Sequence, residues 1–364
     1  MKYFLFISTC LFFIACRSNK TSQPVLVNVT NDIVIPKHYI ISKTTETMNI
    51  DGKAYESCWK HAPFTKNFID IEGLKTPKFN TKVKMLWNND YIYLYAELNE
   101  PHIWATLKQR DTIIFYNNDF EIFLDPSGTG APYGEIEINA LNTIWDLQLD
   151  KAYRVGGNAN FNWNLTNLKS AVQIYGTLNN PKDIDSLWAI EMAIPIKPLM
   201  ALKPTKATTP KEGEQWRINF SRVEWDHDIN NGQYSRKKEN NTFLKEYNWV
   251  WSNQKVINMH EPEKWGFLQF TNASSSKHIE FIEDIDLAIK QTAYALFRRT
   301  KHGDLKYLLN NKQPTKKSIL VTYNSTKTLN AFFEKNNSNF SFQLKSPLTN
   351  IKYHINQNGT LKKL

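Results

Sequence analysis

Hydrophobic and polar residues alternate through residues 118–149, and this alternation predicts three antiparallel strands joined by turns. Successive side chains of a strand point to opposite faces, so every second residue shares a face. The apolar positions are Phe120, Ile122 and Leu124, then Ile136, Ile138 and Ala140, then Trp145, Leu147 and Leu149. The positions between them carry Glu121 and Asp125, then Glu135, Glu137 and Asn139, then Asp146 and Gln148. We therefore expect one surface of this sheet to gather carboxylates and an amide, and such a surface either faces water or lines a polar site.

The same kind of alternation recurs along the chain up to residue 270 and predicts a mainly β fold. A hairpin is expected at 82–98, and further strands at 170–175, 187–195, 215–223 and 265–270. Short strands at this spacing, with no long helical periodicity before residue 277, are typical of an antiparallel β-sandwich of the immunoglobulin or jelly-roll kind. The long irregular connections 99–117 and 225–264 are where binding groups of a rigid sandwich commonly lie.

The pattern changes after residue 272. Ile282, Ile285, Ile289, Ala293 and Leu296 repeat at helical spacing, with acidic residues before them and basic residues after them, which suits the helix dipole. Short alternating runs follow at 318–323, 340–344 and 351–355. The region 273–364 is therefore predicted to be a small α+β region, one helix on a small antiparallel sheet.

The N-terminus predicts export. An apolar run at 3–15 follows Lys2, is too short to span a bilayer, and ends in Ile14-Ala15 before Cys16. This resembles a bacterial lipoprotein signal, so we expect cleavage of residues 1–15 and lipidation of Cys16; an ordinary secretory signal is the alternative. Residues 16–37 are then expected to tether the protein to the cell envelope, at the outer membrane, on either its periplasmic or its outer face.

The cysteine count bears on disulfides, and the distribution of charge bears on the kinds of binding partner that we expect. The sequence has three cysteines, and only Cys58 would remain free after processing, so no intrachain disulfide is expected. The net charge of +10 is concentrated in residues 277–364, which carry 15 Lys and Arg against 6 Asp and Glu. Because the preceding domain is nearly neutral, we do not expect a nucleic-acid partner; the basic region is expected to face water, anionic headgroups or acidic glycans.

Several motifs together resemble a known family. The pattern N-D-x-E-x-F-x-D-P at 118–126 is followed by G-E-x-E-x-N-A-x-N-T-x-W-D at 134–146, with W-A-I-E-M-A-I-P at 188–195 and W-R-I-N-F-S-R at 216–222. In this order they resemble the carbohydrate-binding module family 9 domain, here placed at 38–272. The resemblance implies non-catalytic binding of an oligo- or polysaccharide. In an envelope lipoprotein it implies presentation of glycan to degrading or uptake machinery.

The resemblance also implies site residues. In this family a sugar is held between two aromatic side chains, while carboxylate and amide groups bind its hydroxyls. Glu121 and Asn139 match polar ligand positions, Phe115 the first stacking position, and Met259-His260 the second, whereas Glu137 stands where well-known members carry Arg. Trp251 is a further candidate platform, with core packing as its alternative. The candidate carbohydrate-binding residues are Phe115, Glu121, Glu137, Asn139, Trp251, Met259 and His260.

Other interpretations of the acids stay open. Asp119 and Asp125, with backbone oxygens of 127–131, could hold a structural calcium ion, which the family also implies, or Asp125 could serve a plain turn. Glu121 and Glu137 could be the acid and base of a glycosidase, although an enzyme is not the expectation. Glu121 could also be a structural acid that pairs with Arg110 or Arg222.

Two further alternatives concern the whole protein. Met259 and His260 could be axial haem ligands, but adjacent residues rarely ligate opposite faces of a haem. The sandwich could instead bind another envelope protein, which would make the chain an interaction lipoprotein.

Cys16→Ser should release the protein from the membrane fraction or block its processing, because the substitution removes the predicted acyl attachment point. Membrane partition and incorporation of radiolabelled palmitate measure the effect, with Cys58→Ser as the control. Unchanged partition in Cys16→Ser, together with an unlabelled wild type, would contradict the lipoprotein prediction.

Overall fold

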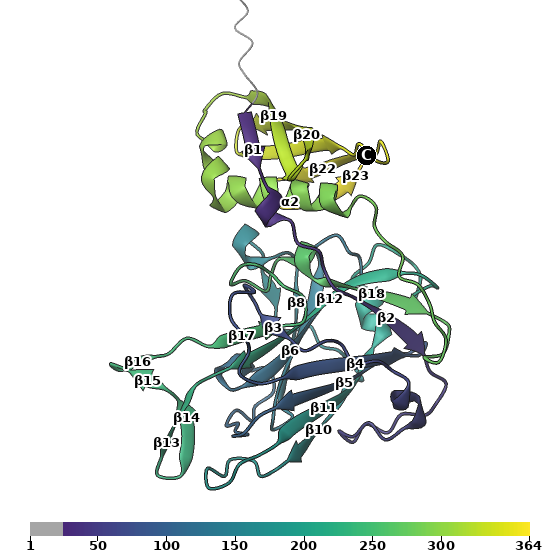
Figure 1. Cartoon of the computed structure of the whole chain (residues 1–364), viewed down its shortest axis with the longest axis vertical. Helices are drawn as coiled ribbons and strands as arrows, with labels where there is room; N and C mark the ends of the chain where they lie inside the picture. Colours follow the sequence, from purple (N-terminus) through teal and green to yellow (C-terminus); the bar gives the residue numbers. More distant parts are fainter. Residues whose placement is uncertain (1–24) are drawn as a thin grey trace, which may run out of the picture.

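The computed structural model describes residues 25–364, which form a large β unit and a smaller unit stacked end to end (Figure 1). The predicted signal sequence 1–15 and the predicted lipidation site Cys16 lie outside the described residues. Within residues 25–364, no helix combines the length and the apolar character needed to cross a membrane.

Thirteen strands form the sheet of the large unit. Eleven follow one another in space as β10 (Lys169–Tyr175), β11 (Leu187–Pro195), β5 (Tyr91–Asn99), β4 (Thr81–Trp87), β2 (His38–Lys43), β18 (Gly266–Thr271), β12 (Gln215–Glu224), β6 (Asp119–Asp125), β7 (Tyr133–Asn139), β8 (Ile144–Leu149) and β9 (Ala159–Asn160). β17 (Tyr247–Val250) pairs with β12, and β3 (Ile69–Asp70) pairs with β17. Neighbours are antiparallel except around β2, which runs parallel to β18 and β4. The predicted mainly β fold class is confirmed.

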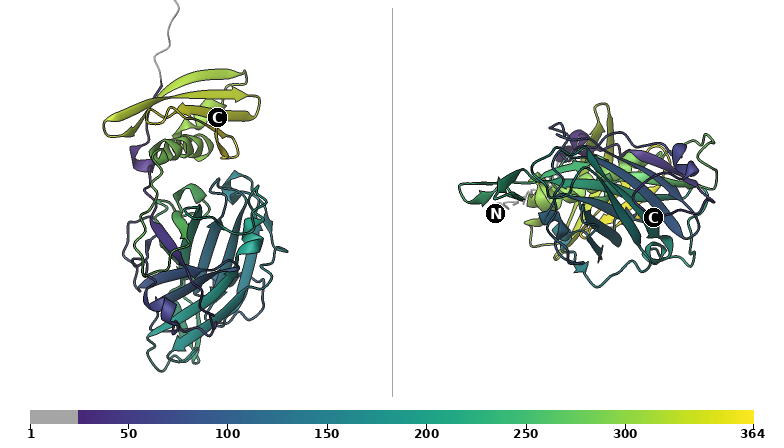
Figure 2. Two further views of the ribbon diagram at one scale, coloured as in Figure 1. Left: turned by 90° about the vertical axis from the view of Figure 1, so that its right-hand side faces the viewer. Right: turned by 90° about the horizontal axis from the view of Figure 1, so that it is seen from below.

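The large sheet curls so that its two halves face each other across one hydrophobic core (Figure 2). Apolar side chains from one face of most of the strands meet there, among them Val83, Ile92, Ile190, Phe120, Ile136 and Phe220. The apolar faces predicted for β6 and β7 therefore point into this core. Their polar faces point the other way, out of the sandwich.

The two faces of the third predicted strand, β8, are exchanged relative to the prediction: its apolar face lies on the carboxylate side of the sheet. Its register pairs Glu137 with Trp145 and Ile136 with Asp146. Directly opposed residues of an antiparallel pair share a face, so Trp145 lies beside the carboxylates and Asp146 lies on the opposite side of the sheet. The expectation that Asp146 and Gln148 join the carboxylate face is wrong. Alternation fixes the faces within one strand, whereas the pairing register decides which faces of neighbouring strands coincide.

The remaining elements of the large unit are short. Two hairpins lie in the long connection after β12, β13 (His227–Asn230) with β14 (Gln233–Arg236) and β15 (Lys238–Glu239) with β16 (Thr242–Phe243), and both project from the sandwich (Figure 1). α1 (Ile196–Met200) follows β11. The 3-10 turns are η1 (Thr30–Asp32), η2 (Ser57–Lys60), η3 (Ile114–Tyr116), η4 (Tyr153–Val155), η5 (Pro262–Lys264) and, in the small unit, η6 (Asp304–Leu309).

The small unit packs α2 (Leu287–His302) against a six-stranded sheet (Figure 1). The strand order is β1 (Val25–Asn28), β19 (Thr315–Asn324), β20 (Lys327–Asn336), β21 (Asn339–Lys345), β22 (Lys352–Asn356) and β23 (Leu361–Lys363). Ile289, Ala293 and Leu296 are buried under this sheet, as the helical spacing predicts. Ile282 and Ile285 precede the helix and are exposed, so the helix is shorter than the spacing predicts.

The first described strand belongs to the small unit, although it lies at the opposite end of the chain. β1 pairs in parallel with β19, and Val27 and Val29 are buried in the core of the small unit. Val34 is buried as well. The prediction of a tether over residues 16–37 is therefore wrong for the described residues 25–34, because these apolar side chains are withdrawn from water.

A buried ion pair joins the two units. Arg298 of α2 donates two hydrogen bonds, of 2.9 and 3.0 Å, to the carboxylate of Glu263 in η5 of the large unit. The Gln291 side chain also donates to the backbone oxygen of Glu263. Because the Glu263 side chain is almost fully buried, losing Arg298 would leave a carboxylate without its partner.

Arg298→Ala should lower the thermal midpoint of unfolding by about 5 °C, because breaking a buried ion pair costs about 3 kcal/mol. Lys316→Ala is the control, because its pair with Glu334 is exposed and should contribute little. Equal shifts in the two variants, measured by calorimetry, would contradict the role of the Arg298 pair.

Candidate functional site

A cleft of about 230 Å³ opens on the carboxylate face of β6 and β7. The carboxylates Glu121, Glu135 and Glu137 come from β6 and β7. Further lining residues come from β8, from η3 and η4, and from the loop before η5. The lining residues include Phe115, Glu121, Phe123, Glu135, Glu137, Trp145, Tyr153, Glu246, Asn258, Met259 and His260. Five of the predicted carbohydrate-binding residues thus meet in one place: Phe115, Glu121, Glu137, Met259 and His260.

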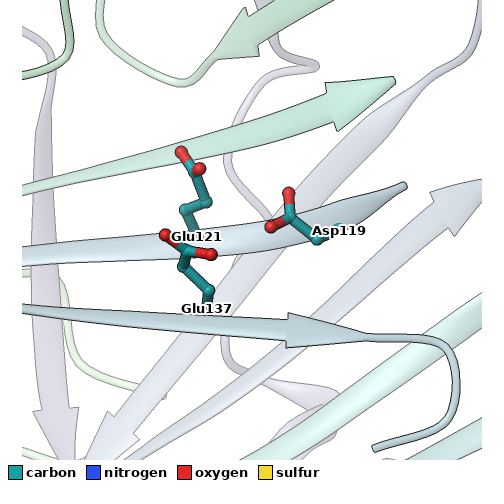
Figure 3. A group of neighbouring side chains, drawn as sticks. All are labelled: Asp119, Glu121 and Glu137. Atoms are coloured by element: carbon teal, nitrogen blue, oxygen red, sulfur yellow. The ribbon is translucent and has the colours of Figure 1, made fainter. Parts of the chain in front are cut away.

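The strand register crowds carboxylates together at this cleft. Glu121 of β6 lies directly opposite Glu137 of β7, and Asp119 is two residues along the same face of β6 (Figure 3). Each of the three offers an oxygen, and these oxygens all lie within 4.8 Å of one another. Like charges directly opposite each other destabilise a strand pair. The arrangement therefore calls for protons or a ligand to relieve the repulsion.

The protein supplies few hydrogen bonds to these groups. The backbone N–H of Phe115 donates to Glu137 Oε2 at 3.2 Å. Both carboxylate oxygens of Asp119, and Oε2 of Glu135, are buried without a hydrogen-bond partner among the described residues. A buried acceptor without a donor loses about 1–3 kcal/mol of hydration, so such groups are exceptions in folded proteins.

Burial and mutual repulsion shift the acid–base behaviour of the site. Burial raises the pKa of Glu121 to about 7. Burial also raises the pKa of Asp119, Glu135 and Glu137 well above the ordinary range, and the neighbouring carboxylates add to the rise. In the free protein these groups therefore hold protons far more readily than surface carboxylates do.

Neither arginine considered as a structural partner reaches Glu121. Arg222 pairs with Glu100 at 2.6 Å and with Glu224 at 2.8 Å, and Arg110 pairs with Asp146. Within the described residues, Glu121 forms no ion pair. The alternative of Glu121 as an acid paired with Arg110 or Arg222 is therefore wrong.

Aromatic side chains form the other wall of the cleft. His260 shares a 2.8 Å hydrogen bond between its Nδ1 and the Tyr133 hydroxyl, and its ring meets Phe123 and Tyr153 edge-on. Burial lowers the pKa of His260 to about 4, so its ring is neutral at physiological pH. Tyr153 is 43% exposed and is available to a ligand. Trp145 lines the same wall.

Two predicted binding residues do not line the cleft. The Asn139 amide donates to the backbone oxygen of Leu107 at 2.8 Å, and its Oδ1 accepts from the backbone N–H groups of Leu141 and Thr143. Asn139 therefore fastens the turn after β7 and is a structural residue here. Trp251 is 2% exposed and packs in the main core, so core packing, its alternative, is the correct interpretation.

The predicted metal pair Asp119 and Asp125 is not brought together, because the two residues stand at opposite ends of β6. The Asp125 carboxylate accepts backbone N–H groups of Ser127, Gly128 and Gly130 at 2.7–2.9 Å, together with the Ser127 hydroxyl. Both oxygens of Asp125 therefore serve as hydrogen-bond acceptors that stabilise the turn after β6. Asp119 instead joins Glu121 and Glu137.

Sequence reasoning missed several residues of the cleft. Glu135 lies on the predicted polar face, but no motif singled it out as a ligand. Trp145 was assigned to the opposite face, and only the register between β7 and β8 corrects this. Tyr153 lies in a short turn after β8 with no sequence signal that could have found it.

A β-sandwich that carries a cleft of carboxylates and aromatic rings on its outer face fits the class of carbohydrate-binding modules. The model of the carbohydrate family 9 binding domain-like family matches residues 50–273, and the chain belongs to this family. The resemblance inferred from the sequence motifs is thereby confirmed.

The chain is also similar to solved structures. A family 9 carbohydrate-binding module from Caldicellulosiruptor kristjanssonii in complex with cellotriose is 15% identical over 68% of this chain and all of its own, with a TM-score of 0.44. The glucose complex from the same organism is 16% identical over 67% of this chain and all of its own, with a TM-score of 0.43. No curated protein matches the chain.

The Glu121→Gln variant should be more stable than the wild type at pH 8 and equally stable at pH 4.5. The pKa of Glu121 rises from 4.5 to about 7 on folding, so the stability it contributes is complete below pH 4.5 and is lost as the pH rises to 7. Thermal midpoints in metal-free, sugar-free buffer measure the difference. His260 titrates in both proteins and cancels from the comparison. Parallel pH curves for the two proteins would contradict the raised pKa.

Proposed function

We propose that the cleft on β6 and β7 binds carbohydrate without catalysis. The observation that carries this proposal is the buried Oε2 of Glu135, which has no hydrogen-bond partner among the described residues, beside Glu121 and Glu137 in a cleft walled by aromatic rings. Sugar hydroxyls are donors that such acceptors need, and a hydrogen bond to an ionised carboxylate is stronger than one between neutral groups.

The apolar wall of the cleft suits the apolar faces of a sugar ring. The C–H faces of a pyranose stack on flat aromatic or soft apolar side chains, which Phe115, Tyr153 and Met259 offer here. A volume of about 230 Å³ lies below the usual range of about 300–1,000 Å³ for small-molecule sites. We infer that the cleft takes a short unit or a chain end.

The geometry disfavours the glycosidase alternative. Glu121 and Glu137 are direct cross-strand neighbours, with oxygens within 4.8 Å. This closeness does not fit an inverting glycosidase, whose two carboxyl groups stand about 6.5–9.5 Å apart to leave room for a water molecule. Two carboxylates on adjacent strands also point to the same side of a ligand, whereas the reaction needs groups on both sides of the scissile bond.

We further propose that the chain is a lipid-anchored envelope protein that presents glycan to degrading or uptake machinery. Eight residues separate Cys16 from β1, a reach of at most about 30 Å. Because β1 belongs to the small unit, the small unit would lie next to the lipid, and the sandwich with its cleft would stand farther out (Figure 1).

Glu121→Ala should weaken sugar binding ten- to hundredfold, because loss of a charge-assisted hydrogen bond costs about 1.5–3 kcal/mol. Phe115→Ala should also weaken binding through lost stacking, whereas Glu97→Ala should not, because Glu97 lies on β5 outside the cleft. Calorimetric titration against a panel of mono- and oligosaccharides measures these affinities. No binding across a broad panel would favour the protein-interaction alternative, and wild-type affinity in Glu121→Ala would exclude this cleft.

A further inference from the structure

We propose that Asp119, Glu121 and Glu137 hold a divalent cation of the calcium class at the inner end of the cleft. The effect of this cation on sugar binding rests on the proposed function. The cation site itself rests only on the arrangement of the side chains. The site differs from the predicted pair of Asp119 with Asp125, whose carboxylate oxygens are used by its own turn.

The spacing of the three carboxylates fits one ion. Oxygens on opposite sides of a calcium ion stand about 4.6–5.2 Å apart, since each bond is about 2.3–2.6 Å long. One oxygen from each of Asp119, Glu121 and Glu137 lies within 4.8 Å of the others, so all three fit around a common centre. Two neighbouring strands hold them, which fixes their positions more firmly than a loop would.

Two buried polar side chains at this point have no hydrogen bond of normal geometry within the described residues. The Asp119 side chain is fully buried, and both of its oxygens are unpaired among the described residues. The Ser221 hydroxyl is also fully buried and makes no hydrogen bond of normal geometry within residues 25–364, and it lies beside the Glu121 carboxyl group because Ser221 is directly opposite Glu121 on β12. A cation between the carboxylates would satisfy Asp119, and Ser221 would supply a further oxygen beside it.

A sugar alone does not account for Asp119. Glu121 and Glu137 line the cleft, but Asp119 is behind the lining and has no exposed surface. A sugar in the cleft therefore reaches two of the three acids. A cation bound to Glu121 and Glu137 reaches the third as well, because its oxygen lies within 4.8 Å of theirs.

The remaining charges around the site favour a cation. The residues that line the cleft include Glu135 and Glu246 and no lysine or arginine. Nearby carboxylates attract a cation, and no basic side chain of the lining competes for it. Calcium takes six to eight oxygen ligands, so positions on the cleft side stay open for water or for a pair of sugar hydroxyls. The cation would thus make sugar affinity depend on calcium.

Calcium titration of the full chain, after treatment with chelator, tests the site. We expect one calcium ion to bind the wild type, and Glu137→Gln and Asp119→Asn to bind it at least tenfold more weakly. Glu97→Gln removes the same charge outside the cleft and should bind calcium as the wild type does. Absence of calcium binding at millimolar concentration, or equal affinity in all four proteins, would overturn the proposal.

A second measurement does not depend on the folding of those variants. Trp145 is the cross-strand neighbour of Glu137, so it should sensitise the luminescence of a terbium ion in the site. Trp145→Phe should lose most of this emission, which calcium should also displace from the wild type. Undiminished emission in Trp145→Phe would place the ion elsewhere and overturn the proposal.

Sugar titrations with calcium and with chelator separate this inference from the proposed function. Sugar binding that falls at least tenfold in chelator supports both. Calcium binding without any sugar binding leaves the cation site standing and overturns the proposed function. Equal sugar binding in both buffers, with no calcium binding, overturns the cation site and leaves the proposed function standing.

Discussion

The pairing of β6 with β7 is the constraint on which the site depends. It sets Glu121 against Glu137 on one face while Phe120 and Ile138 on the other face hold the strands in the core. The apolar side chains fix the register, because a slip of one residue would turn the apolar face outward. The carboxylates must therefore stay close together, whatever their repulsion. Repulsion between buried carboxylates has to be relieved by protons or by a bound ligand. A fold that retains such repulsion at one place therefore indicates a binding site there.

The sequence allowed the strands to be predicted far better than the contacts between them. Period-two alternation located β6, β7 and β12, and the family motifs pointed to Phe115, Glu121 and Glu137, all of which meet in the cleft. The partner of a buried polar group cannot be found in this way. Asn139 has the right residue type and face, but its amide bonds to the turn.

Other features depended on contacts between distant segments. Trp145 lines the cleft because of the register of β8, which the sequence does not reveal. Trp251 was predicted to bind sugar, but it packs in the core. The four residues of β1 looked like part of a polar tether, yet their partner strand is almost 300 residues away. Short apolar runs of this kind carry no local signal that tells a strand from a linker, because their burial is decided by the rest of the fold.

The central claim is that a ligand resolves the crowding of carboxylates in the cleft. The most direct measurement is a crystal structure of the full chain with calcium and the sugar that binds best in solution. The expected density shows an ion between Asp119, Glu121 and Glu137, with a sugar beside Phe115 whose hydroxyls contact the same carboxylates. Sugar density on another face of the sandwich, with these three side chains unchanged and unliganded, would contradict the claim.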